Sequence, residues 1–429
     1  MASSIEVVLL TAPSYCSKTE TTPPEKGLLQ SRCQEILALV PVPSSADILY
    51  RHITFSTSKS YMMGAAAVGG REGISSYPGS AGGTVSTGWE EEAGRHIPLL
   101  RGWLTKLLQW IWWNPVIQPR VVRLFSALQS LGISICPNHY YWPVPDVADL
   151  RSRDWPLVTP TPGLELNLEG QREFATNVVA RYERECSFSS GPGTRISEYH
   201  YNNGLFECVD AEVAYAMVRH HKPKRVIEVG GGYSTRLIAN ALQRNAASDG
   251  KPGELITIEP FPEEALRNGF PGLSMLIADP AQKVDVNLFA SLSEGDVLFV
   301  DSSHVVKTGS DVCYECLQIL PRLKPGVLVH FHDIFLPCEY PRQAVLERLC
   351  FWSEQYLLQA FLAMNDGFEV LWAASAMQLF HPEVVESAIP RWRGSYTRMP
   401  PEIRRFQPTL DGDRVWPASF WMRRKPQPA

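Results

Sequence analysis

The chain has 429 residues, of which 45% are hydrophobic and 20% charged, so it is long enough for more than one globular domain. A formal net charge of -5 argues against a nucleic-acid partner recruited by bulk positive charge. Nine cysteines without disulfide-like spacing, and a first stretch too short in apolar residues for a secretion signal, predict a cytoplasmic location.

The first 95 residues predict a poorly ordered N-terminal extension. Short ordered pieces are expected at 5–10 and 34–40. Residues 58–95 are rich in Ser, Gly and Ala and lack the large side chains whose burial would offset chain entropy, which predicts a linker. The composition of this extension indicates no particular function.

Residues 97–117 predict a tryptophan-rich helix. Four tryptophans crowd this segment, and Pro115 ends it before the roughly 20 apolar residues of a transmembrane span. One hypothesis is a helix lying at a membrane surface, since tryptophans and cations favour lipid headgroups. The alternatives are a lid on the catalytic domain and a contact with a partner, including a second copy of the chain.

The segment 96–200 predicts a helical and aromatic cap that precedes the core domain. Further helices are expected at 120–131 and 171–184, where apolar residues recur with helical spacing. Between them, 139–147 is an aromatic, proline-bounded stretch, and the two interpretations of its rings are the lining of a substrate pocket and plain packing.

From residue 201 to 429, strands alternate with helices. This order predicts parallel strands joined by right-handed crossovers, in an α/β fold with a doubly wound, mostly parallel, Rossmann-like sheet. A long helix is expected at 342–364, and the last two strands are expected to close the sheet as an antiparallel pair. The seven predicted strands are 225–229, 254–259, 274–278, 296–301, 326–332, 368–373 and 418–423.

Three consecutive glycines, Gly230, Gly231 and Gly232, directly follow the first of these strands and precede a helical pattern. A strand, a glycine turn and a helix in this order form a nucleotide-binding unit, because glycine lets the backbone approach a ligand closely. Glu228 stands two residues before the first glycine. An acid there suits a ligand with a cationic amino group better than a pyrophosphate.

Acidic residues also end the second and third strands. Glu259 follows Gly232 by 27 residues and is predicted to accept hydrogen bonds from ribose hydroxyls. Asp279 ends the third strand and is predicted to accept one from an adenine amine. The ordered set of glycines and acids is more specific than the glycine turn alone.

This pattern resembles the class I S-adenosylmethionine-dependent methyltransferases. Glu228 and the glycines match their first motif, and the sequences 301–304, 307–311, 323–326 and 330–337 resemble the methyltransferase-24 subgroup. The resemblance covers about residues 135–425. It implies S-adenosylmethionine as the cofactor, with Glu228, Gly230, Gly231, Gly232, Glu259 and Asp279 as its binding residues.

A second group of polar residues follows the fourth and fifth strands: Asp301, His304, His332 and Asp333. Because these strands are neighbours in the predicted order, the four side chains are expected to converge beside the donor. In one hypothesis His332 or His304 is the general base, since imidazole titrates near neutral pH. In the other, Asp301 and Asp333 hold a divalent metal (Mg, Mn or Fe) that orients the acceptor hydroxyl.

The sequence therefore predicts a methyltransferase that acts on a hydroxyl group of a small-molecule substrate in secondary metabolism. His332, His304 and Asp301 are the expected catalytic residues, with His332 the favoured base. One alternative keeps the fold and donor site but performs metal-dependent, non-methylating chemistry. The other is a non-catalytic binding module that uses the tryptophan-rich helix.

Overall fold

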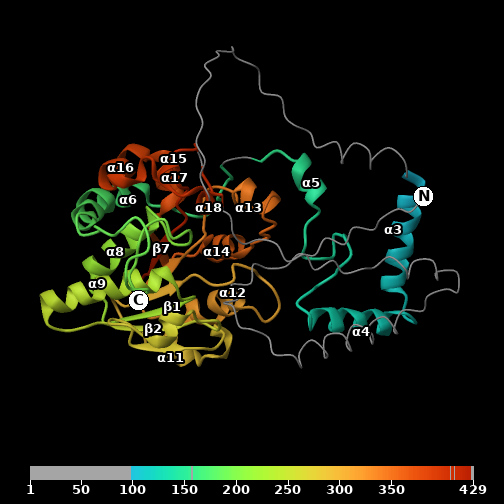
Figure 1. The fold of residues 1–429 in the computed structure, drawn as a ribbon, viewed down its shortest axis with the longest axis horizontal. Coiled ribbons are helices and arrows are strands. Elements are labelled where there is room, and N and C mark those ends of the chain that lie inside the picture. The colour runs from blue at the N-terminus through green and yellow to red at the C-terminus, as the bar shows by residue number, and fades with distance from the viewer. Residues whose placement is uncertain (1–97, 156–157, 406, 410, 427–429) are drawn as a thin grey trace, which may run out of the picture. The chain divides into compact units, whose positions relative to one another are not determined.

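A computed structural model describes residues 98–155, 158–405, 407–409 and 411–426 (Figure 1). The chain divides into two compact units, 1–144 and 145–429. The predicted pieces at 5–10 and 34–40 and the predicted linker lie outside the described residues. The boundaries predicted at 95 and 200 stay predictions.

The described part of the first unit consists mainly of α3 (Pro98–Trp113) and α4 (Gln118–Gln129). Trp110 and Trp113 are 55% and 53% exposed, whereas Trp112 packs edge-on against Trp142 at 5.4 Å between ring centroids. Within the described residues, no helix has both the length and the apolar character needed to cross a bilayer. The membrane, lid and partner hypotheses for this helix stay predictions.

The second unit contains a seven-stranded sheet of order β3-β2-β1-β4-β5-β7-β6. Strands β1 to β5 pair in parallel, and β7 runs antiparallel to both β5 and β6. The doubly wound, mostly parallel sheet and its antiparallel closing pair confirm the predicted fold class. The strands are β1 (Arg225–Val229), β2 (Glu254–Ile258), β3 (Met275–Ile277), β4 (Val297–Val300), β5 (Leu328–Phe331), β6 (Phe368–Ala373) and β7 (Phe420–Arg424).

Helices precede, connect and follow the strands, and short π-helical (Ala175–Val179, Glu315–Ile319) and 3-10 turns (Ala281–Lys283, Leu320–Arg322, Pro390–Trp392) interrupt the series. Before β1 lie α5 (Val147–Ser152), α6 (Leu168–Phe174), α7 (Ala180–Glu183) and α8 (Asp210–His221). Between strands lie α9 (Tyr233–Asp249), α10 (Glu264–Asn268), α11 (Val286–Ala290), α12 (Asp311–Tyr314), α13 (Arg342–Leu346), α14 (Glu354–Leu362), α15 (Ala374–Phe380), α16 (Pro382–Ala388), α17 (Ser395–Arg398) and α18 (Pro401–Arg404).

Alternating strand residues build a separate core on each face of the sheet. In β4, Val297 and Phe299 pack with residues of α8, α9 and α16, whereas Leu298 and Val300 pack with residues of α11, α14 and the π-helical turn after α12. Figure 1 shows α8 and α9 side by side along the sheet. Because both faces are covered, the central strands are apolar throughout, as expected for a parallel sheet.

The prediction of one continuous helix over residues 342–364 is wrong. The structure has two helices there, α13 and α14, separated by residues 347–353. Leu349 has a φ of +57°, which no residue inside a right-handed helix adopts. The break lets Trp352 leave the helical path and pack 5.2 Å from the ring of His304. A long-range aromatic contact thus outweighs the local helical pattern.

Candidate functional site

The glycine turn between β1 and α9 is held against the end of β2. The N–H of Gly230 donates to the carbonyl of Ile258 at 2.9 Å, and the N–H of Gly231 donates to the carboxylate of Glu259 at 3.2 Å. Gly230 has a φ of +86°, and a Cβ on it would lie 1.8 Å from the carbonyl oxygen of Asp301. Glycine is required at this position by both its backbone conformation and its contact with β4.

Glu228 is sealed beneath this turn. Its side chain is 0% exposed and accepts hydrogen bonds from Ser234 at 2.7 Å, Thr235 at 2.7 Å and Thr257 at 2.8 Å. Burial raises its pKa to about 7, although the three hydroxyl groups oppose that shift. Glu228 is not one of the described residues that line the two cavities next to the turn. The hydrogen bonds of Glu228 thus connect the start of α9 with β1 and β2.

Two cavities adjoin the turn and share Gly230, Glu259 and Asp301 as lining residues. The central cavity, of about 300 Å³, also contains His304, His332 and Asp333 in its wall. The side cavity, of about 390 Å³, is lined by Phe261, Pro280, Gln282, Lys307 and Asp311, among others. The arrangement therefore offers one continuous ligand two neighbouring spaces at the carboxyl edge of the sheet.

The predicted acids at the second and third strand ends are placed differently from one another. Glu259 lines both cavities, and its carboxylate accepts from the N–H groups of Gly231 and Phe261. Asp279 is exposed just beyond β3 and is not among the described cavity residues, although the adjacent Pro280 lines the side cavity. Their ribose and adenine roles stay predictions.

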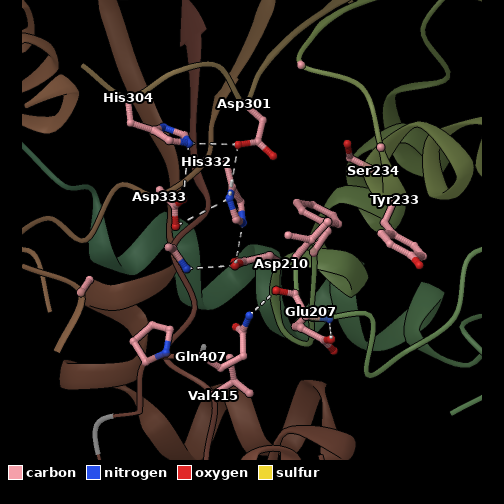
Figure 2. A pocket seen from close by; sticks show the side chains of 18 of the residues that line it. Glu207, Asp210, Tyr233, Ser234, Asp301, His304, His332, Asp333, Gln407 and Val415 are labelled. Atoms are coloured by element: carbon pink, nitrogen blue, oxygen red, sulfur yellow. Dashed lines mark hydrogen bonds and ion pairs between the residues drawn. The ribbon is translucent and has the colours of Figure 1, made fainter. Parts of the chain in front are cut away.

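The four predicted residues at the ends of β4 and β5 do converge (Figure 2). Nε2 of His304 lies 3.4 Å from carboxylate oxygens of both Asp301 and Asp333. Nδ1 of His332 lies 3.7 Å from Asp301 and 3.8 Å from Asp333. Ligand atoms of Asp301, His332 and Asp333 all fall within 4.8 Å of one another, so these three side chains could hold one metal ion.

Charge pairing decides the protonation of this cluster. Burial raises the pKa of Asp301, but His332 and His304 outweigh burial and lower that pKa to about 2. Burial lowers the pKa of His332, but nearby carboxylates, Asp301 first, raise it to about 9. The pKa of His304 is held well above its ordinary value, against burial, by Asp301 and Glu354. These shifts favour the protonated form of both imidazoles and the ionised form of Asp301.

Two acidic partners of the histidines were missed by sequence reasoning. Asp210 lies 3.4 Å from Nε2 of His332, and its carboxylate also accepts from the backbone N–H groups of Ala418 and Ser419, each at 2.9 Å. Glu354 lies 2.8 Å from Nδ1 of His304 and is 1% exposed. Asp210 begins α8 and Glu354 begins α14, and their contacts with the histidines join residues distant in sequence.

His330 is a packing residue of β5. The residue is 0% exposed, stacks on Phe299 at 3.8 Å between ring centroids, and has Nε2 at 2.9 Å from the hydroxyl of Ser419. Asp311 lines the side cavity and accepts from Ser303, while Ser310 caps α12.

Comparisons with known proteins agree with this geometry. The sequence profile of the methyltransferase-24 family, described as a methyltransferase domain, matches residues 227–334. An uncharacterized protein of Archaeoglobus fulgidus is 31% identical over 177 residues, which cover 39% of this chain and 78% of that protein. The chain belongs to the methyltransferase-24 family. It is a class I S-adenosylmethionine-dependent methyltransferase, as the sequence pattern predicts.

A solved structure, the SAH-bound methyltransferase PaMTH1 of Podospora anserina, covers 46% of this methyltransferase and 82% of its own chain. It has 18% sequence identity and a TM-score of 0.28, so the likeness is too remote to support further conclusions. The family match spans β1, the glycine turn, β4 and β5, and it therefore includes most of the central-cavity residues named above.

Replacing Gly230 with alanine should unfold or distort the methyltransferase turn. A Cβ at a positive φ and 1.8 Å from a backbone oxygen forces β1 and β4 apart. We expect Gly230→Ala to lower the free energy of unfolding by at least about 2 kcal/mol, measured by urea denaturation. Gly269→Ala is the control, because Gly269 has a φ of +66° but no atom within 4 Å of its Cβ position. Equal losses in the two variants would contradict the proposed clash.

The raised pKa of Glu228 makes stability depend on pH with a definite sign. Its folded pKa of about 7 exceeds the ordinary 4.5, so its proton stabilises the folded state fully below about pH 4.5. That contribution is lost as the pH rises to about 7. Relative to wild type, Glu228→Gln should therefore gain up to about 3 kcal/mol of stability between these pH values. Urea denaturation of wild type, Glu228→Gln and the exposed control Glu264→Gln at several pH values tests this. The same pH dependence of the free energy of unfolding in all three proteins would contradict the prediction.

Proposed function

We propose that the protein transfers the methyl group of S-adenosylmethionine to a hydroxyl group of a small molecule of secondary metabolism. The observation that carries this proposal is the common location of the glycine turn and His332 in the wall of one cavity of about 300 Å³. A space of this size suits the amino acid end of the donor together with a small acceptor. Methyl transfer needs mainly that the two be held in line while one proton is removed.

Apolar side chains support a small acceptor with an apolar body. Phe335, Trp352, Val415 and Trp416 line the central cavity beside the His/Asp cluster. Phe335 and Trp416 pack edge-to-face at 5.5 Å between ring centroids. The pocket role predicted for the aromatic stretch 139–147 stays a prediction.

His332 is the proposed general base. In the transfer, the acceptor oxygen attacks the methyl carbon, the carbon–sulfur bond breaks, and the hydroxyl proton passes to the imidazole. The pKa of His332 in the donor-free protein is about 9, because carboxylates such as Asp301 favour its charged form over the effect of burial. The positive sulfonium of the donor opposes that charge and so favours the neutral, proton-accepting imidazole.

Replacing His332 should separate catalysis from donor binding. We expect His332→Gln to lower kcat by about 10²- to 10⁴-fold while the Kd for S-adenosylmethionine stays nearly unchanged. Because only the neutral imidazole accepts a proton, wild-type kcat/KM should rise with pH up to about 9, and the variant should lack this rise. The control is His220→Gln, at the exposed end of α8. A variant with the wild-type rate and pH profile would exclude His332 as the base.

A second hypothesis for the same cluster is a divalent cation held by Asp301, His332 and Asp333. The residues fit such an ion, since their ligand atoms lie within 4.8 Å of one another and two carboxylates with an imidazole suit Mn or Fe. When bound, the ion would act as a Lewis acid that lowers the pKa of the acceptor hydroxyl. Asp301, His332 and Asp333 would then all be ligands, and the imidazole of His332 would not be the proton acceptor.

Removal of metal should distinguish the two roles. If the cation is required, dialysis against EDTA should reduce methyl transfer at least about tenfold, and Mn²⁺ should restore it. Asp333→Asn should then lose Mn²⁺ binding in calorimetry while donor binding remains. Full activity after EDTA treatment would exclude the metal role and leave His332 as base. Tightly bound iron with no methylated product would instead favour the non-methylating alternative.

A further inference from the structure

Glu207 is a buried acid in the wall of the central cavity that the sequence analysis did not single out. It is 4% exposed and shares this cavity with Gly230, Gly232 and Ser234 of the glycine turn and its helix. Figure 2 shows it near Asp210 and Gln407, away from His304 and Asp301. Its carboxylate is therefore placed to meet the part of a ligand that binds at the turn.

The loop before α8 holds this carboxylate in place. Its two oxygens accept hydrogen bonds from the N–H groups of Gly204 at 2.7 Å and Asn202 at 3.1 Å. Asn203 closes the same loop by accepting from the N–H groups of Leu205 and Phe206. A carboxylate offers about four acceptor positions. The backbone N–H of Asn203 also faces this carboxylate, so at least one acceptor position remains for a ligand.

Glu207 has no cationic partner among the residues that the structure describes. Burial raises its pKa to about 7 against the effect of its backbone hydrogen bonds, and no cation contributes to that shift. Buried carboxylates are normally paired, because an unpaired buried charge is costly. Such an exception in a ligand cavity indicates that the missing cation belongs to the ligand.

The other acids of the central cavity are already engaged. Asp301 and Asp333 face two histidines, and Asp210 faces His332 and accepts from two backbone N–H groups. Glu228, the acid at which the sequence pattern points, is enclosed by three hydroxyl groups beneath the turn. Glu259 lines both cavities, and its carboxylate accepts from the N–H groups of Gly231 and Phe261.

We propose that Glu207 binds the α-ammonium group of the methyl donor and so fixes its amino acid end beside the glycine turn. This inference rests on the donor site proposed above. The methyl donor carries two positive groups, the sulfonium and the ammonium, and the geometry assigns them to different acids. The sulfonium lies toward the His/Asp cluster, where the reaction occurs, and the ammonium lies toward Glu207. Glu207 is thus a binding and positioning residue.

Calorimetry with a matched pair of ligands tests the assignment. The pair is S-adenosylhomocysteine and 4-(adenosylthio)butanoate, in which hydrogen replaces the ammonium group. At about pH 8, where Glu207 is mostly ionised, wild type should bind S-adenosylhomocysteine about 10- to 100-fold more tightly than the analogue. Glu207→Gln should lose most of this preference, because it weakens binding of the amine-containing ligand and leaves the analogue within a few fold.

Asn203→Ala is the control for loop structure. It disturbs the same loop but keeps the carboxylate, so it should weaken both ligands by a similar factor and preserve the preference. An equal loss of both ligands in Glu207→Gln would show a purely structural role and overturn the proposal. If Glu207→Gln does not fold, Glu207→Asp is used, which keeps the charge on a shorter side chain. Its preference should stay above threefold, and a preference near one would overturn the proposal.

Wild-type behaviour separates this inference from the proposed function. If wild type binds both ligands equally, Glu207 does not recognise the ammonium group, but the donor site stands. If wild type binds neither S-adenosylhomocysteine nor S-adenosylmethionine, the donor site itself is wrong and the inference falls with it.

Discussion

The site depends on a row of backbone hydrogen bonds that continues past the ends of the parallel strands. The N–H of Asp301 donates to the carbonyl of Val229 at 2.8 Å, and the N–H of His332 donates to that of Val300 at 3.0 Å. Each bond extends the strand pairing by one residue and delivers a polar side chain to the same edge of the sheet. Because strand residues alternate between faces, a slip of one residue in either pairing would turn Asp301 or His332 away from the cavity.

Two glutamates near the turn, Glu228 and Glu207, have different roles because they lie at different depths below the cavity surface. Glu228 lies inside β1, where three hydroxyl groups enclose it and water cannot reach it. Glu207 lies in a loop, where backbone N–H groups orient it and the cavity reaches it. Both have a pKa raised to about 7 by burial. The first acid stabilises the turn, and the second is available to a cationic ligand.

The cavity carries more carboxylates than cations, and this balance suits a positively charged methyl donor. Glu207, Asp210, Glu259, Asp301 and Asp333 line it, against His304, His332 and Arg348. Attraction of this kind strengthens in a site from which water is excluded. Methyl transfer removes the sulfonium charge and would therefore weaken this attraction. S-adenosylhomocysteine would then be released more readily than S-adenosylmethionine.

The sequence alone determined the order of strands and helices, the glycine turn and the convergence of Asp301, His304, His332 and Asp333, because these follow from local periodicity and from the common edge of parallel strands. It did not reveal that helix 342–364 is broken, nor that Asp210, Glu354 and Glu207 meet the site. Only tertiary structure decided those features, since they depend on contacts between segments far apart in the chain. Trp352 illustrates the reason: its packing against His304 outweighs the helical preference of its neighbours.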